Sequence, residues 1–233
     1  RVTTLWQRKL VVTGLLSVYG DCEGPGILER KVARSIDPLA TAYESSNFID
    51  RFMNLRVACS SDLSAIVRIY NQAIRQGQGE GDQPVTAFRE PLTVSDRREW
   101  FDRHDAGAHP IWVAERKGDV AGWCSLSPYR AGRAALRKAT EISYYVDVRH
   151  RRNGVASALM DRALRTAPDL GFDTVIAVLL EGNRASIGLL KQCGFAEWGR
   201  LPQLAAFDDR RFDHLIYGRH VGPLDDSIAD VAG

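Results

Sequence analysis

A basic loop between a predicted strand and a predicted helix constrains this chain more than any other segment. The β-rich stretch 139–148 is followed by basic residues and then small ones, RHRRNGVASALM over 149–160. The first amides of a helix have no partner inside the helix, and the helix dipole adds partial positive charge there. Gly154 and Ala156 leave room for anionic oxygens to approach the backbone. The pattern therefore predicts a strand–loop–helix unit whose helix N-terminus binds a pyrophosphate.

The spacing of this loop differs from two common phosphate-binding motifs. A P-loop requires Gly-x-x-x-x-Gly-Lys-Ser/Thr, and a dinucleotide-binding fingerprint requires three glycines after the first strand of a βαβ unit. Neither pattern stands at this junction. Because the six-residue pattern is short, a solvated basic turn is its structural alternative.

The downstream sequence continues the same architecture. Residues 174–180 (TVIAVLL) form an unbroken apolar, β-branched run, which is typical of a buried parallel strand. A predicted helix over 183–192 follows, with Gly194 placed to end it and Phe195 to pack back on the domain. Strands first, followed by a β-loop-α-β-α-β order, predict an α/β layered domain with a mixed sheet. Strands are predicted at 55–58, 111–115, 120–126, 139–148, 174–180 and 214–220.

These motifs together resemble the acyl-CoA site of the GNAT superfamily of N-acetyltransferases. The shared features are Arg151-x-x-Gly154-x-Ala156, the Asn183-x-x-Ser186 turn, and Gly-Phe at 194–195. The segments 121–123, 140–146, 149–157 and the stretch after Trp198 further resemble its phosphinothricin and methionine sulfoximine acetyltransferase branch. The resemblance implies a GNAT-like fold: a mixed, mostly antiparallel twisted sheet flanked by helices and splayed in the middle for acyl-CoA. It also implies acetyl transfer to the amine of a small amino acid or amino-acid-like toxin.

The similarity covers 55–221, so one acetyltransferase domain is expected over 53–222. Residues 1–52 are expected to be an N-terminal leader or extension, and 223–233 a C-terminal tail. The apolar stretch 10–19 leaves a signal peptide as an alternative for part of the extension.

The composition argues against several classes of binding partner. A net charge of +2 gives no case for nucleic-acid binding, and no run reaches the ~20 apolar residues that a membrane span requires. The cysteines are scattered and form no CxxC pair, which favours a reduced, cytoplasmic compartment. The histidines share no ligand spacing, so no metal site is predicted.

The resemblance implies acetyl-CoA as cosubstrate, with loop amides on its pyrophosphate and strand backbone along its pantetheine arm. A backbone N–H near Val146 is implied to polarise the thioester carbonyl. The matching positions are Tyr144, Tyr145, Val146, Arg151, Arg152, Asn153, Gly154, Val155, Ala156, Ser157, Asn183 and Ser186. The alternatives are that the two tyrosine side chains are ordinary sheet residues and that Asn183 is a helix N-cap. Both roles of Asn183 are compatible.

Amine acetylation needs a base, because an aliphatic amine with a pKa of ~10.4 is protonated at neutral pH. Glu141 matches the catalytic glutamate of the resembled family. It precedes Val146 by about 17 Å of extended strand, so the resemblance implies a bulge, a splay and a relaying water. The alternative is a surface glutamate paired with Arg137 or Lys138. Cys124 and Cys193 have no activating neighbour in sequence, which favours direct attack in a ternary complex.

A carboxylate or phosphinate on the acceptor requires a cation. The candidates for acceptor binding are Phe88, Arg89, Arg130, Arg133 and Arg137, with a solvated surface role as the alternative for each arginine. Leu190 stands where the resembled branch often has His, so the general acid is unassigned unless Tyr145 or solvent serves.

Three alternatives remain open at this level. The first is acetylation of a protein N-terminus or lysine. The second is a regulatory module that binds acyl-CoA without catalysis. The resemblance also makes a homodimer a possible assembly.

Overall fold

The computed structural model describes residues 53–76 and 83–222. The predicted extension (1–52), the tail (223–233) and the glycine-rich segment 77–82 lie outside the described residues. The elements in chain order are β1 (Asn54–Val57), η1 (Ser60–Asp62), α2 (Leu63–Gln76), α3 (Val94–Asp102), β2 (Ile111–Arg116), β3 (Asp119–Pro128), η2 (Ala134–Leu136), β4 (Ala139–Val146), η3 (Val148–His150), α4 (Val155–Thr166), β5 (Thr174–Leu180), α5 (Arg184–Gln192), β6 (Ala196–Phe207) and β7 (Arg210–His220).

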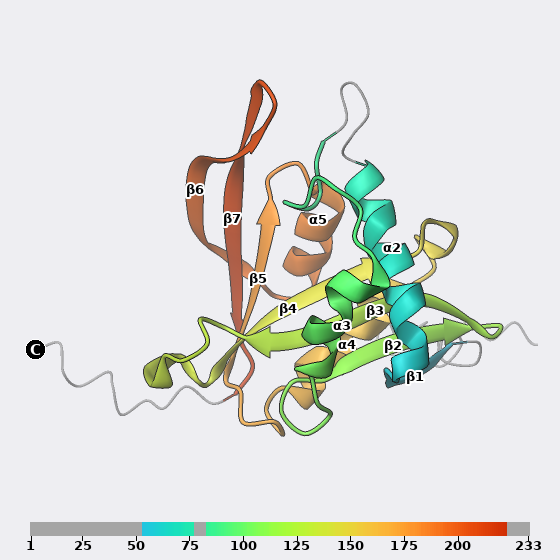
Figure 1. Ribbon diagram of the computed structural model, residues 1–233. Helices are drawn as coiled ribbons and strands as arrows, with labels where there is room; N and C mark the ends of the chain where they lie inside the picture. Colours follow the sequence, from blue (N-terminus) through green and yellow to red (C-terminus); the bar gives the residue numbers. More distant parts are fainter. Residues whose placement is uncertain (1–52, 77–82, 223–233) are drawn as a thin grey trace, which may run out of the picture.

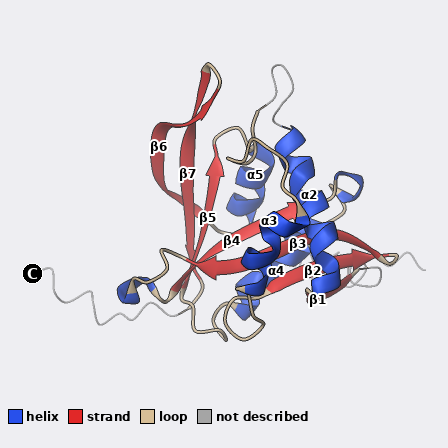
Figure 2. Cartoon of the chain, viewed as in Figure 1, coloured by secondary structure: helices blue, strands red, loops and turns tan. Residues whose placement is uncertain are grey.

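The strands form one twisted sheet in the order β1-β2-β3-β4-β5-β7-β6 (Figures 1 and 2). Only the β4–β5 pair is parallel; the other pairs are antiparallel. This confirms the predicted α/β fold with a mixed, mostly antiparallel sheet.

Helices cover both faces of the sheet because its strands are apolar on both sides. One core cluster joins α4 and α5 to the face that carries Cys124, Ile142 and Leu215. A second cluster joins α2 and α3 to the opposite face around Val113 and Trp123. We refer to this second side as the acceptor face.

The central strands β4 and β5 diverge after three paired positions. Their register runs Ala139↔Thr174, Thr140↔Val175 and Glu141↔Ile176, and each strand then continues without pairing to the other. The predicted splay is therefore confirmed. The predicted bulge is wrong, because the β3–β4 register is regular from Thr140 to Val146. β4 keeps its regular pairing with β3, and the splay arises because β5 turns away from β4.

The helix starts follow local capping chemistry. α3 begins with a capping box at Thr93. The hydroxyl of Thr93 accepts from the Asp96 amide, and the Asp96 carboxylate accepts from the Thr93 amide at 2.7 Å. The reciprocal Thr–Asp pair satisfies both exposed amides at the start of α3. At α5 the predicted Asn183 cap is present, and Gly194 ends the helix at φ +75°.

The last two strands form a long hairpin that projects past the end of β5 (Figure 1). The sequence predicted a final strand only over 214–220, whereas β6 and β7 extend to a turn at Asp208–Asp209. The ion pair between Arg89 and Asp208 joins the turn of this hairpin to the segment before α3. Within the described residues, no helix is both long and apolar enough to cross a membrane.

Candidate acyl-CoA and acceptor site

A cavity of about 370 Å³ lies where β4 and β5 diverge. Its walls come from β4, β5, the start of α4, the start of α5 and one side of α2. Every residue predicted for cofactor binding lines it except Asn153, which is exposed beside it. The structure therefore brings the two halves of the predicted site together around one elongated space.

The backbone of β4 faces this cavity with free hydrogen-bonding groups. The Asp147 amide donates to the Ala121 carbonyl at 2.9 Å, which makes Asp147–Ala121 a hydrogen-bonded pair of the β3–β4 ladder. Such pairs alternate along an antiparallel ladder. The amides and carbonyls of Tyr144 and Val146 therefore point away from β3, toward the side that β5 has left. An extended pantetheine chain could pair with them as an added strand does.

The start of α4 presents the other end of the cavity with unpaired amides. The first intrahelical bond of α4 runs from Ala158 N to Gly154 O, so the amides of 155–157 have no partner within the helix. Gly154 caps the helix at φ +77°, and Arg152 also has a left-handed backbone at φ +59°. This geometry turns successive amides toward one point, which suits a diphosphate.

A fully buried carboxylate holds this loop in place. Asp147 has no exposed surface and accepts from the Arg149 amide at 3.0 Å and from its guanidinium at 3.0 and 3.1 Å. Arg68 of α2 forms a second ion pair with Asp147. Burial alone would raise the pKa of Asp147, but these bonds hold it well below its ordinary value. Arg149 is thus turned back toward Asp147, whereas Arg151 and Arg152 line the cavity.

The start of α5 closes the opposite wall. The Asn183 side chain accepts from the Ser186 amide at 3.2 Å, as an N-cap, while both residues line the cavity. The Tyr144 hydroxyl lies 3.5 Å from the Ser186 carbonyl, and burial raises the pKa of this tyrosine to about 12. Leu190 is fully buried in the same wall and offers no proton. The Tyr145 ring instead packs on Tyr70 and Trp123 at 4.7 and 4.9 Å, on the acceptor face.

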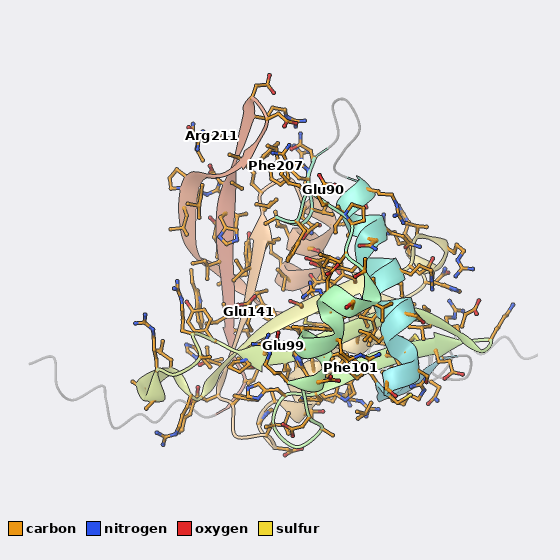
Figure 3. The ribbon with its side chains drawn as sticks, in the orientation of Figure 1. Glu90, Glu99, Phe101, Glu141, Phe207 and Arg211 are labelled. Atoms are coloured by element: carbon orange, nitrogen blue, oxygen red, sulfur yellow. The ribbon has the colours of Figure 1, made fainter. Side chains whose placement is uncertain are left out.

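Glu141 lies at the point where β4 and β5 separate (Figure 3). Its side chain is half-buried on the acceptor face, in the row of Ser143 and Tyr145. Burial raises the pKa of Glu141, and the positive charge of Arg130 offsets part of this rise. Neither Arg137 nor Lys138 pairs with it; Lys138 lies 3.8 Å from Asp173 instead. Among the described residues, the Glu141 carboxylate has no hydrogen bond or ion pair, so it is available to a substrate.

The predicted acceptor residues lie on two segments. Arg130, Arg133 and Arg137 are exposed on the loop between β3 and β4, and only Arg130 acts electrostatically on Glu141. Phe88 packs edge-on against Tyr70 at 5.7 Å, in the segment before α3. Arg89 of the same segment pairs with Asp208. None of these five residues lines the acyl-CoA cavity.

An exposed tryptophan on the acceptor face was missed from the sequence. Glu141, Ile176 and Gly218 occupy one row across β4, β5 and β7. A Cβ at Gly218 would lie 2.0 Å from the Trp198 indole, so the absent side chain makes room for that ring. Trp198 is 45% exposed and lies against His220 at 4.9 Å. The Gly–Trp contact depends on the β6–β7 register, which single-sequence patterns do not reveal.

Two of the cysteine thiols, Cys124 and Cys193, are poorly suited to nucleophilic attack. Cys124 is buried on the α4 side of β3, and burial raises its pKa. Burial also raises the pKa of Cys193, which follows α5. Neither thiol is therefore prepared as a nucleophile.

Three features define an acyl-CoA-dependent transferase site. They are the divergent strands β4 and β5, the open N-terminus of α4, and the buried Asp147 between β4 and α4. The family model described as Acetyltransferase (GNAT) family matches residues 77–195. The chain belongs to this family.

Individual relatives agree with this assignment. YwnH of Bacillus subtilis, named "Putative phosphinothricin acetyltransferase", is 42% identical over 72% of this chain and 99% of its own length. An L-methionine sulfoximine/L-methionine sulfone acetyltransferase of Pseudomonas aeruginosa is 31% identical over 73% of this chain and 95% of its own. The crystal structure of a Sinorhizobium meliloti phosphinothricin acetyltransferase in complex with AcCoA matches with a TM-score of 0.66 and 27% identity. It covers 73% of this chain and 89% of that one.

Proposed function

We propose that this protein transfers acetyl from acetyl-CoA to the amine of a small amino acid or amino-acid-like toxin. The phosphinothricin and methionine sulfoximine type is the favoured acceptor. The observation that carries the proposal is the cavity at the β4–β5 divergence, with unpaired α4 amides at one end, together with Glu141 at the last position where the two strands pair. The names of the relatives support the acceptor class.

In this proposal the two substrates approach opposite sides of one strand. The cavity binds the acyl carrier through Tyr144, Val146 and the α4 loop, while the amine enters from the acceptor face. Glu141 takes the ammonium proton, and the freed amine attacks the thioester carbonyl. A carbon–nitrogen bond forms and the carbon–sulfur bond breaks. The acylated nitrogen gives up its second proton, and the departing thiolate takes up one proton through solvent, so the net product is one proton, the one that Glu141 accepted. The inert environment of Cys124 supports direct transfer without an acyl-enzyme.

Arg130 is the best candidate for the acceptor's acid group. It is the only one of the predicted arginines whose charge acts on Glu141, so an amino acid could place its amine on the glutamate and its carboxylate on Arg130. Arg133 and Arg137 lie on the same basic loop between β3 and β4. Phe88 and Arg89, in the segment before α3, are proposed to line the other side of the acceptor site. These roles complete the proposed acceptor site.

The test is release of free thiol from acetyl-CoA with a panel of amines: methionine sulfoximine, phosphinothricin, proteinogenic amino acids and a peptide with a free N-terminus. We expect turnover with a small amino acid and a fall of about 10²–10⁴-fold in Glu141→Gln, with unchanged acetyl-CoA affinity. Glu99→Gln is the matched control, because Glu99 is an exposed carboxylate on α3 (Figure 3). Turnover of the peptide alone would favour protein acetylation. Binding without turnover of any amine would favour a regulatory module.

We also propose that the protein is cytoplasmic, with its cysteines in the reduced form, and that it forms a homodimer. The buried free thiol of Cys124 supports the first point. The edge strand β6 supports the second, because it exposes Trp198, Leu201 and Leu204. Light scattering measures the mass in solution, and a monomer at all concentrations would contradict the pairing.

A further inference from the structure

Ser127 is the polar neighbour of Glu141 on the acceptor face. The two residues oppose each other in the β3–β4 register, and directly opposed residues project to the same side of a sheet. Their Cβ atoms are therefore about 5 Å apart. A substrate ammonium or a single water can bridge such a gap between the hydroxyl and the carboxylate.

His104, in the loop after α3, reaches the same hydroxyl from outside the sheet. Its Nε2 lies 3.1 Å from Ser127 Oγ, and its Nδ1 lies 2.7 Å from the Trp100 carbonyl oxygen. A carbonyl oxygen can only accept, so Nδ1 carries the hydrogen of the neutral ring. Nε2 is then the acceptor, and the Ser127 hydroxyl donates to it. This leaves the lone pairs of Ser127 Oγ free to accept a proton from the side of Glu141.

The surroundings keep His104 ready to accept a proton. It is half-buried, and burial lowers its pKa. The hydrogen bond to the Trp100 carbonyl raises the pKa and offsets part of this shift, the charges of His109 and Arg103 lower it further, and Asp105 raises it. The ring is thus neutral at neutral pH, and the residue is partly exposed to solvent.

We propose that Ser127 and His104 form a proton relay that carries the acceptor's proton from Glu141 to solvent. The inference rests on the proposed acetyl transfer at this site. Glu141 first takes a proton from the ammonium, whose N–H bond breaks. The proton then passes to Ser127 Oγ as the original hydroxyl proton moves to His104 Nε2. The imidazolium releases that proton to water, and the Ser127 hydroxyl rotates to donate to Nε2 again, which restores both residues and leaves Glu141 ionised for the next turnover. No electrons change hands.

The test is kinetic and uses His104→Gln, whose amide can hold the Ser127 bond but cannot carry a proton. We expect kcat to fall about tenfold in weakly buffered solution, with both KM values and Tm unchanged. This is less than the 10²–10⁴-fold effect of a positioned acid or base, because Glu141 still takes the proton from the amine. Free imidazole should restore kcat, because it replaces the missing base from solvent. His220→Gln is the matched control, since His220 is exposed on β7, its Nδ1 lies 3.2 Å from Thr174 Oγ1, and its charge does not act on His104. A loss that imidazole does not restore, or no loss, overturns the relay.

A second variant tests the connection itself. Ser127→Ala should lower kcat as much as His104→Gln, and the double variant should be no slower than either one, because both interrupt one path. Additive losses would overturn the proposal. If the wild-type protein acetylates no amine, the proposed function fails by itself. The relay is then tested by an NMR titration of His104, which should shift to lower pH in Glu141→Gln; an unchanged titration would refute the coupling.

Discussion

The left-handed glycine at the start of α4 gives the sharpest test of the phosphate-binding loop. Gly154 has φ +77°, and Gly194, at the end of α5, has φ +75°. An L-residue in this region costs roughly 1–2 kcal/mol. For a protein of this size, about 1 kcal/mol lowers Tm by about 2–4 °C. Gly154→Ala and Gly194→Ala should therefore each lower Tm by about 2–8 °C, as measured by thermal denaturation.

Only one of the two substitutions should affect acyl-CoA binding. Gly154 lines the cavity and sets the direction of the first α4 amides, whereas Gly194 lies outside the cavity, and a Cβ added there would lie 3.7 Å from the flexible Arg219 guanidinium. Losing one hydrogen bond to a charged group costs about 1.5–3 kcal/mol, which is about a 10- to 100-fold rise in Kd. Isothermal titration calorimetry with CoA measures this rise directly. The Gly194→Ala variant should bind CoA as the wild type does.

A truncated acyl donor separates the pyrophosphate from the rest of the carrier. S-acetylpantetheine lacks the nucleotide, so Gly154→Ala should leave its kcat/KM unchanged. Two results would refute the reasoning: a Gly154→Ala variant that loses stability while keeping its CoA affinity, or an equal loss of CoA affinity in Gly194→Ala. Either would mean that the α4 amides do not hold the diphosphate.

Three further variants test the supports of the site. Asp147→Asn should lower the free energy of unfolding by about 1–3 kcal/mol at neutral pH, discounted because its arginine partners are part-exposed. Since the folded-state pKa of Asp147 is lowered, this loss should begin to shrink as pH falls below the unfolded value of ~3.9 and vanish only below the lower folded-state pKa, as measured in denaturant titrations; a pH-independent loss would contradict the charge-based account. The folded-state pKa of Glu141 is raised because burial disfavours its charged form, so ionisation of Glu141 lowers the stability of the fold as pH rises. The neutral side chain of Glu141→Gln should therefore give a higher Tm than the wild type at neutral pH but not at acid pH. Gly218→Ala should displace the Trp198 ring and lower the free energy of unfolding by about 1–3 kcal/mol. The displacement should change the tryptophan fluorescence spectrum, and an unchanged spectrum would mean that the ring has room for the added methyl group.

The sequence was most informative where function and local structure share the same residues. Residues 149–160 combine basic side chains, a glycine and a helix start, so a single window predicts both the turn and its ligand. The apolar run at 174–180 likewise predicts β5 over the bounds that the structure has. Both signals depend on neighbours in the chain and need no knowledge of the sheet order.

The missed features depend on distant partners. Asp147 is an ordinary acidic residue in sequence, and its role requires Arg68 from α2, 79 positions earlier. His104 acquires its partner only when α3 packs beside β3, which places Ser127 within 3.1 Å. The β6–β7 arm escaped prediction because β6 is an exposed edge strand with two irregularities, so it lacks a regular apolar alternation.

The alternation of β4 explains how one strand can serve two substrates. At even positions such as Tyr144 and Val146, the backbone faces the cavity left by β5, and no side chain is needed for that contact. At odd positions such as Glu141, the side chain projects to the acceptor face, where the proposed chemistry needs a carboxylate. A shift of the β3–β4 register by one residue would exchange both sets together. Because the register contains no bulge, the divergence of β5 can expose backbone to one substrate while the same strand presents its base to the other.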